Sequence, residues 1–182
     1  QLLTFLAPNR AIDIAQALVN IYAQSGIFPK WSLANGESYI MIGDPADAIL
    51  ADIYAFGGTN FDTKTALADM IKEATQANNI RPGLSWLESL GYLPQDGSNS
   101  SYGCCNFNGT AATTLDYNSA DFALGAFAQA IGDTTNAQTF ITRAQDWKNL
   151  FNSSNKYLEP RKINGSYPFI YILESEGSWV EG

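Results

Sequence analysis

The sequence predicts an all-α fold made of antiparallel helix pairs. Apolar residues recur at helical spacing in six segments, with proline, aspartate and glycine at their starts and stops, and one pattern of helix and loop occurs twice. Alternation typical of a strand is visible only around residues 167–173. Because short turns join antiparallel neighbours, repeated hairpins would either stack into a solenoid or close into an α/α toroid.

Each expected helix has a start and a stop signal. Proline is favoured in a first turn, an aspartate side chain caps free backbone N–H groups, and glycine adopts the left-handed conformation that ends a helix. On these signals the helices start at Pro8, Pro45, Asp62, Leu84, about Leu115 and Asp133, and they end at Ser25, Gly57, Asn78, Gly91, Ile131 and Leu150.

The repeated pattern predicts where a binding site would form. Gly26-Ile27-Phe28-Pro29 recurs as Gly91-Tyr92-Leu93-Pro94, and Ala46-Asp47 aligns with Ala120-Asp121. The unit is a helix, a Gly-x-x-Pro segment, a long loop, a second helix and a short turn, with a period of roughly 65 to 75 residues. If the long loops all emerge at one end, that end would carry the site.

The composition indicates one globular core. The chain has 182 residues, of which 46% are hydrophobic, and no apolar run approaches the length of a transmembrane helix. A net charge of −8 with ten scattered basic residues argues against nucleic-acid binding. An acidic surface suits a protein that acts on a neutral ligand.

The available chemistry and the compartment follow from a few residue types. Histidine is absent, so proton transfer falls to carboxylates, tyrosines, lysines or the two cysteines, Cys104 and Cys105, whose adjacency excludes a CxxC motif. Four N-glycosylation sequons favour a secreted protein, although loops rich in Asn and Ser would also produce such matches. The candidate asparagines are Asn99, Asn108, Asn152 and Asn164.

Three carboxylates stand at loop ends, those of Glu37, Asp44 and Glu181. Paired carboxylates are what glycoside hydrolysis requires, because one acid protonates the leaving oxygen while a second activates water or attacks the sugar. Each residue also has a simpler interpretation. Asp44 precedes a proline and suits a helix N-cap, Glu37 suits an exposed loop acid, and Glu181 suits a solvated terminal acid.

Three aromatic residues near these loops, Trp31, Tyr39 and Trp179, have two interpretations. Their rings could stack on the faces of sugars, or they could belong to the core.

Seven segments occur in the order and approximate spacing seen in glycoside hydrolase family 92, and the resemblance covers essentially the whole chain. These segments are Gly26-Ile27-Phe28-Pro29-Lys30-Trp31, Met41-Ile42-Gly43-Asp44, Ala51-Asp52-Ile53-Tyr54 with Phe61-Asp62, Gly91-Tyr92-Leu93-Pro94, Thr114-Leu115-Asp116-Tyr117, Arg143-Ala144-Gln145-Asp146-Trp147-Lys148-Asn149-Leu150-Phe151 and Glu181-Gly182. The sequence therefore resembles the calcium-dependent exo-acting alpha-mannosidases of that family.

The resemblance implies a fold and an activity. Residues 1–182 would be an internal piece of the catalytic domain, about half of an (α/α)6 toroid, without the N-terminal β-sandwich domain and the C-terminal half of the toroid. The full-length enzyme would release mannose from N-glycans or mannans with inversion, at alpha-1,2 linkages above all, and the isolated piece would be inactive.

The family's general acid lies in a Glu-Gly motif, which Glu181-Gly182 matches, and Glu176-Gly177 is the alternative placement. The resemblance makes Trp31, Glu37 and Asp44 candidates for shaping the sugar subsite. It also implies a catalytic base and a calcium site, both beyond Gly182, so no metal ligands are expected within this chain.

Some residues depart from the family pattern. Pro45 stands where the family often has histidine, Asp116 where it has glutamate, and Ala120 where it has an acid. These departures put the linkage preference in doubt more than the fold. The alternatives are a non-catalytic helical carbohydrate-binding scaffold and another (α/α)6 glycosidase.

Overall fold

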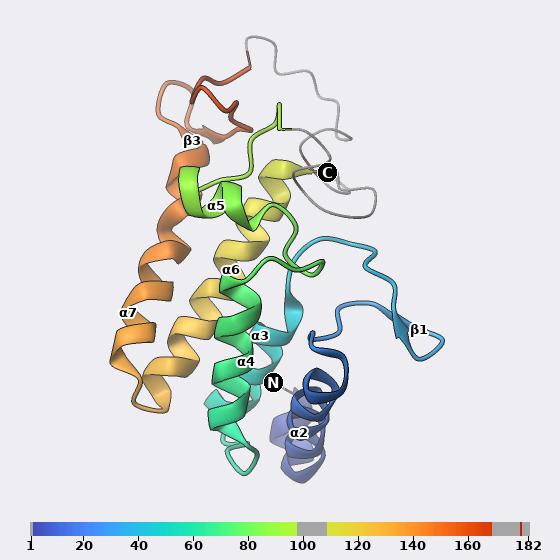
Figure 1. Ribbon diagram of the computed structural model, residues 1–182. Helices are drawn as coiled ribbons and strands as arrows, with labels where there is room; N and C mark the ends of the chain where they lie inside the picture. The colour runs from blue at the N-terminus through green and yellow to red at the C-terminus, as the bar shows by residue number, and fades with distance from the viewer. Residues whose placement is uncertain (1, 98–108, 169–178, 180–182) are drawn as a thin grey trace.

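The computed structural model describes residues 2–97, 109–168 and 179, which form a mostly helical structure (Figure 1). The helices are α1 (Leu2–Leu6), α2 (Pro8–Ser25), α3 (Pro45–Ala55), α4 (Thr63–Thr75), α5 (Leu84–Leu90), α6 (Thr110–Ala130) and α7 (Thr134–Arg143), with a 3₁₀ helix, η2 (Ala144–Leu150), directly after α7.

The helix boundaries largely follow the sequence signals. The Asp62 carboxylate accepts a hydrogen bond from the Thr65 N–H at 3.1 Å, and the Asp133 carboxylate accepts one from the Asn136 N–H at 3.0 Å. Both aspartates therefore cap the helices that follow them, as expected. The sixth expected helix is split, because its second half is wound as the 3₁₀ helix η2.

α6 begins five residues before the expected start at Leu115. Its first turns are rich in threonine, and Thr110, Thr113 and Thr114 are buried. The Thr114 hydroxyl donates to the Thr110 carbonyl at 2.8 Å and accepts the Leu93 N–H at 3.0 Å. Hydrogen bonds of this kind make polar side chains compatible with burial, so an apolar period could not reveal this part of the helix.

Two short antiparallel hairpins correct the all-α expectation. β1 (Ser32–Leu33) pairs with β2 (Gly36–Glu37), and β3 (Phe151–Asn152) pairs with β4 (Tyr157–Leu158). Strands of two residues are too short to carry a visible alternation. Of the segment where alternation was expected, residues 169–173 lie outside the described part of the chain.

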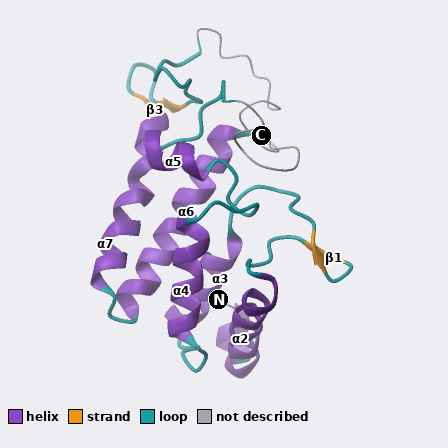
Figure 2. Cartoon of the chain, viewed as in Figure 1, coloured by secondary structure: helices purple, strands orange, loops and turns teal. Residues whose placement is uncertain are grey.

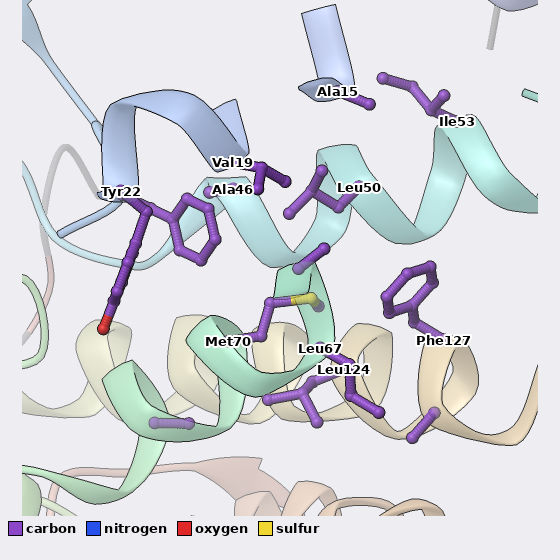
Figure 3. Packing of buried hydrophobic residues seen from close by; sticks show 14 of the residues in the cluster. Ala15, Val19, Tyr22, Ala46, Leu50, Ile53, Leu67, Met70, Leu124 and Phe127 are labelled. Carbon is purple, nitrogen blue, oxygen red and sulfur yellow. The ribbon is translucent and has the colours of Figure 1, made fainter. Parts of the chain in front are cut away.

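The main core lies between α2, α3, α4 and α6, where apolar side chains from all four helices meet (Figure 3). At one end of this core, the Phe127 ring of α6 lies edge-on to the Tyr54 ring, with 5.3 Å between the ring centroids. The same ring stacks on Phe61, with 6.2 Å between the centroids. Gly125 lets α7 approach α6 closely, because a Cβ at this position would lie 2.8 Å from Cγ1 of Ile141. The helix pairs are thus packed into one body.

The two repeated units are visible in the structure. Gly26 and Gly91 both have positive φ, 76° and 72°, and each ends a helix by donating its N–H to a carbonyl of the last turn. Phe28 and Leu93 are both fully buried. The Phe28 N–H donates to Glu73 on α4, and the Leu93 N–H donates to Thr114 on α6.

The first long connection of the repeat, after α2, lies toward the end of the bundle opposite the short turns between α3 and α4 and between α6 and α7 (Figures 1 and 2). Most of the second long connection, between α5 and α6, lies outside the described residues. No helix in the described residues is both long and apolar enough to cross a bilayer.

Candidate functional site

A single guanidinium group, that of Arg81, binds three carboxylates. Nε donates to Asp44 at 2.8 Å, Nη2 to Asp47 at 2.7 Å and Nη1 to Asp121 at 2.6 Å. All four side chains are at most 1% exposed. Asp44 precedes α3, Asp47 lies in its first turn and Asp121 lies on α6, so Arg81 ties α3 to α6 from the connection between α4 and α5.

The segment that carries Arg81 is itself fixed by hydrogen bonds. The Asn78 side-chain carbonyl accepts the N–H groups of Ile80 and Arg81, both at 2.8 Å. On the other side, the Tyr117 hydroxyl donates to the Pro82 carbonyl at 3.0 Å, and the Arg81 guanidinium lies 5.5 Å from the centroid of the Tyr117 ring. The guanidinium group is therefore held in place by more than its ion pairs.

Asp121 is shared by two arginines. Arg143 at the end of α7 donates to Asp121 through Nε at 2.5 Å and through Nη2 at 2.6 Å, and its Nη1 donates to the Ala74 carbonyl of α4 at 3.0 Å. The carboxylate thus receives hydrogen bonds from Arg81 and from a bidentate partner, the strongest geometry for such a pair.

Carboxylates already outnumber arginines in this cluster by three to two, and Glu73 adds a fourth carboxyl group. Glu73 is buried, and its Oε2 accepts the Phe28 N–H at 2.9 Å. Burial raises the pKa of Glu73 to about 8, with a further contribution from the charge of Asp44. Burial, and then Asp44, also raise the pKa of Asp47. At neutral pH we therefore expect Glu73 to be largely protonated, which reduces the excess negative charge.

The structure corrects the interpretation of Asp44 as a helix cap. Asp44 does stand at the N-cap position of α3, but its side chain makes no capping hydrogen bond. Its Oδ2 binds Arg81 instead, and its Oδ1 is buried without a partner among the described residues. A buried arginine offers this carboxylate a charge-assisted hydrogen bond, which is stronger than one from a neutral backbone N–H group.

Glu37 is likewise not the exposed loop acid of the simpler interpretation. Its carboxylate accepts the backbone N–H groups of Lys30 at 2.8 Å, Trp31 at 3.0 Å and Tyr39 at 2.8 Å. It therefore fixes both ends of the loop that contains the β1–β2 hairpin. This loop needs such an anchor, because four of its non-glycine residues have positive φ, namely Ala34, Asn35, Tyr39 and Met41.

The aromatic candidates divide between surface and core. Trp31, between Lys30 and β1, is 48% exposed and remains available for stacking on a ligand. Trp179 packs against the small cluster of Tyr92, Ala111 and Leu150, as a core residue would. Tyr39 is partly buried.

Several predicted residues lie outside the described part of the chain. They are the candidate acids Glu176 and Glu181, the sequon asparagines Asn99 and Asn108, and the adjacent Cys104 and Cys105. Of the remaining sequons, Asn164 is exposed, and Asn152 is partly buried with its amide nitrogen donating to Glu159 at 2.6 Å.

The described residues do not fit a calcium ion. Arg81 occupies the position between Asp44, Asp47 and Asp121 that a cation would need, and no group of three or more His, Cys, Asp or Glu side chains in the described ranges could hold a metal. Oxygen ligands converging on one point are the requirement for calcium. A calcium ion would therefore need ligands from outside the described ranges.

Sequence reasoning missed the centre of this cluster. Arg81 lies in Ile80-Arg81-Pro82, a connection without a motif, and Glu73 lies on the apolar face of α4. One signal was present, because Asp47 and Asp121 occupy equivalent positions in the repeat and both stand among apolar residues of a helix. Buried aspartates in such places require a cationic partner.

The chain matches the Glycosyl hydrolase family 92 catalytic domain over residues 1–182. It belongs to this family. A comparison with curated proteins found no match.

Solved structures of family 92 enzymes are similar to this chain. An inverting mannosidase of the family from Bacteroides thetaiotaomicron VPI-5482 is 25% identical, with a TM-score of 0.84 over 96% of this chain and 23% of that chain. A second alpha-mannosidase from Bacteroides thetaiotaomicron gives 26% identity and a TM-score of 0.81 over 94% of this chain and 22% of its own. The structure of that enzyme in complex with mannoimidazole is 25% identical to this chain, with a TM-score of 0.78 over 89% of this chain and 20% of that chain. The chain thus spans less than a quarter of these enzymes.

Proposed function

We propose that the full-length protein containing this chain is an exo-acting alpha-mannosidase. It would release mannose from N-glycans or mannans with inversion, with a preference for alpha-1,2 linkages. The observation that carries the proposal is the likeness to the inverting family 92 mannosidase, which extends over 96% of this chain with a TM-score of 0.84. The complex of a second relative with mannoimidazole supports a mannoside as the substrate class.

The proposed architecture is an (α/α)6 toroid to which this chain contributes about half. The repeated units, the antiparallel helix pairs and the position of the long connection after α2, opposite the short turns, support it. In such a ring the end with the long loops faces the substrate. A second domain and the rest of the ring would come from other parts of the full-length protein.

Glu181 is the proposed general acid, with Glu176 as the alternative. An inverting glycosidase protonates the leaving oxygen with one carboxyl group while a second carboxylate activates water on the opposite face of the sugar. The two groups stand roughly 6.5 to 9.5 Å apart so that the water fits between them. The catalytic base, and the ligands of the calcium ion that the family implies, would come from residues outside this chain.

The described residues at the loop end have supporting roles in this proposal. Trp31 would stack on a sugar ring, because its indole is half exposed beside the β1–β2 hairpin. Glu37 and Asp44 would shape the sugar subsite indirectly, since their carboxylates bind the loop backbone and Arg81 respectively. The sequons support a secreted enzyme.

The test is a pair of matched variants in the full-length protein, Glu181→Gln and Glu176→Gln. If Glu181 is the acid, its variant should hydrolyse alpha-1,2-mannobiose several orders of magnitude more slowly, while an aryl mannoside with a good leaving group is less affected, because such a group needs little protonation. Glu176→Gln should retain nearly wild-type activity.

The same protein tests the other parts of the proposal. NMR of the first product should show beta-mannose, the inverted anomer. Near-normal hydrolysis of mannobiose by Glu181→Gln would refute that residue as the acid, and sugar binding without turnover by the wild type would favour a non-catalytic scaffold. The 182-residue chain alone should not turn over substrate, because it contains only part of the domain.

A further inference from the structure

The guanidinium group of Arg161 joins segments that are distant in the sequence. Arg161 follows β4, and its guanidinium carbon lies 5.3 Å from the ring centroids of both Tyr92 and Tyr167. Its Nε donates to the Gly165 carbonyl at 2.9 Å, and its Nη1 donates to the Asn149 carbonyl of η2 at 3.0 Å. Cation–π contacts and hydrogen bonds therefore fix the group against the loop after α5 and the end of η2.

Tyr92, in the loop after α5, is held at both ends of its side chain. Its hydroxyl donates to the Lys162 carbonyl at 2.9 Å, across 70 residues of sequence, while the guanidinium group of Arg161 lies over its ring. Gln95 of the same loop donates its N–H to the Arg161 carbonyl at 2.8 Å. Tyr92 is buried. Its position thus depends on the segment around Arg161.

Trp179 packs against the cluster that contains Tyr92 and Leu150. Leu150 directly follows the residue whose carbonyl binds Arg161, so the arginine supports both of these cluster members. Glu181, the proposed general acid, follows Trp179 by two residues, a length of chain that reaches at most about 7 Å. The packing of Trp179 therefore limits where the backbone of the acid can lie.

We propose that Arg161 and Tyr92 are positioning residues for the general acid and that they act through Trp179. This proposal rests on the mannosidase function proposed above, with Glu181 as its acid. A general acid must lie within hydrogen-bond distance of the leaving oxygen, and a displacement of about 1 Å can slow a reaction roughly a hundredfold. Packing and hydrogen bonds that hold the support of a catalytic group in one place supply this precision.

The experiment compares two substrates in the full-length protein. Alpha-1,2-mannobiose needs a proton on its leaving oxygen, whereas 2,4-dinitrophenyl alpha-mannoside has a leaving group that needs little protonation. The ratio of the two kcat/KM values does not depend on how much of the sample is folded. Partial unfolding therefore cannot imitate a specific loss of acid catalysis.

The variants remove the contacts one at a time. Arg161→Met, Tyr92→Leu and Trp179→Leu break them, while Tyr92→Phe keeps the ring and Trp179→Phe keeps an aromatic side chain. Trp179 is only partly buried, so Trp179→Leu tests the proposal even if the other two disruptive variants do not fold. Arg10→Met and Tyr157→Leu are the matched controls, because both side chains are exposed.

We expect Arg161→Met and Trp179→Leu to lower kcat for mannobiose roughly tenfold or more, while KM stays within about twofold. Hydrolysis of the dinitrophenyl mannoside should fall by no more than about threefold, because that reaction depends little on the acid. The two phenylalanine variants should keep most of the wild-type ratio, and the controls should match the wild type. A merely structural role would slow both substrates alike.

The outcomes separate this proposal from the function on which it rests. If the wild type hydrolyses no mannoside, or if Glu181→Gln leaves the ratio unchanged, the proposed function or its acid fails. If Glu181→Gln lowers the ratio but Arg161→Met and Trp179→Leu leave it within about twofold of the wild type, the positioning role is overturned while the mannosidase remains.

Discussion

Asp47 and Asp121, which occupy equivalent positions in the two repeated units, bind the two terminal nitrogens of one buried guanidinium group, at 2.7 and 2.6 Å. The units are thus joined by shared charge as well as by apolar packing. Arg81 comes from neither helix but from the connection between α4 and α5. The same connection supplies the carbonyls that bind Lys30 and Tyr117.

Replacing Arg81 should strongly destabilise the fold. Arg81→Met leaves Asp44, Asp47 and Asp121 buried around an apolar side chain, and breaking a buried ion pair from one side typically costs about 3 to 5 kcal/mol. Urea unfolding followed by circular dichroism measures the loss. Arg10→Met is the matched control, because Arg10 pairs with Asp13 on the surface at 3.6 Å, and such pairs contribute at most about 1 kcal/mol. Equal stability losses for the two variants would contradict the role of Arg81.

Glu73 should make stability fall as the pH rises toward 8. Its pKa is raised from an ordinary 4.5 to about 8 by burial and by Asp44, so the folded state keeps a proton that the unfolded state releases. The stabilisation is complete below pH 4.5 and is lost as the pH rises through about 8. Glu73→Gln imitates the protonated form. We expect this variant to have a flatter profile between these pH values and to exceed the wild type in stability at pH 8.

Asp62→Asn provides a control of opposite sign. The backbone N–H and hydroxyl of Thr65 lower the pKa of Asp62, so its contribution is present above the ordinary value of 3.8 and is lost as the pH falls. This variant should change the pH dependence of stability only in acid and leave the slope near pH 7 intact. Unfolding free energies measured at pH 5 to 9 distinguish the two variants, and an unchanged slope in Glu73→Gln would show that another group holds the proton.

The helical part of the fold was predictable because its signals are local. Asp62 and Asp133 precede their helices by one residue, and Gly26 and Gly91 end theirs, so each boundary depends on neighbours in sequence. The antiparallel direction of neighbouring helices was predictable as well, because short turns join them. The start of α6 was missed because the residues buried in its first turns are threonines, which contribute nothing to an apolar period.

The charged cluster was not predictable in the same way, because its contacts are distant in sequence. Arg81 meets Asp44, Asp47 and Asp121 across 37, 34 and 40 residues. A single sequence shows no periodicity for such a contact, and a favoured local role for Asp44, the helix cap, concealed the distant one. Glu37 was similarly misread, since nothing local shows that three N–H groups converge on it.

Gly91 and Gly26 should respond differently to alanine although both have positive φ. At Gly26 a Cβ meets nothing within 4 Å, so Gly26→Ala adds only the left-handed backbone strain, roughly 1 to 2 kcal/mol. At Gly91 a Cβ would overlap the side-chain amide of Asn149 and approach the Asp146 carboxyl carbon to 3.2 Å. Overpacking of this kind adds about 1 to 3 kcal/mol. The unfolding temperature of Gly91→Ala should be well below that of Gly26→Ala, and the reverse order would contradict the packing of Gly91 against η2.

The two described sequons should differ in glycan occupancy when the full-length protein is secreted from a eukaryotic host. The Asn152 amide nitrogen donates to the buried Glu159 at 2.6 Å, so a glycan on this nitrogen would crowd a folded contact. Asn164 is exposed, and with the described residues its side chain bonds only through its carbonyl oxygen, which accepts from the N–H and hydroxyl of Ser166. Asn164→Gln and Ser166→Ala should each remove one glycan in mass spectrometry, whereas Asn152→Gln should remove none. A glycan on Asn152 with none on Asn164 would refute this assignment.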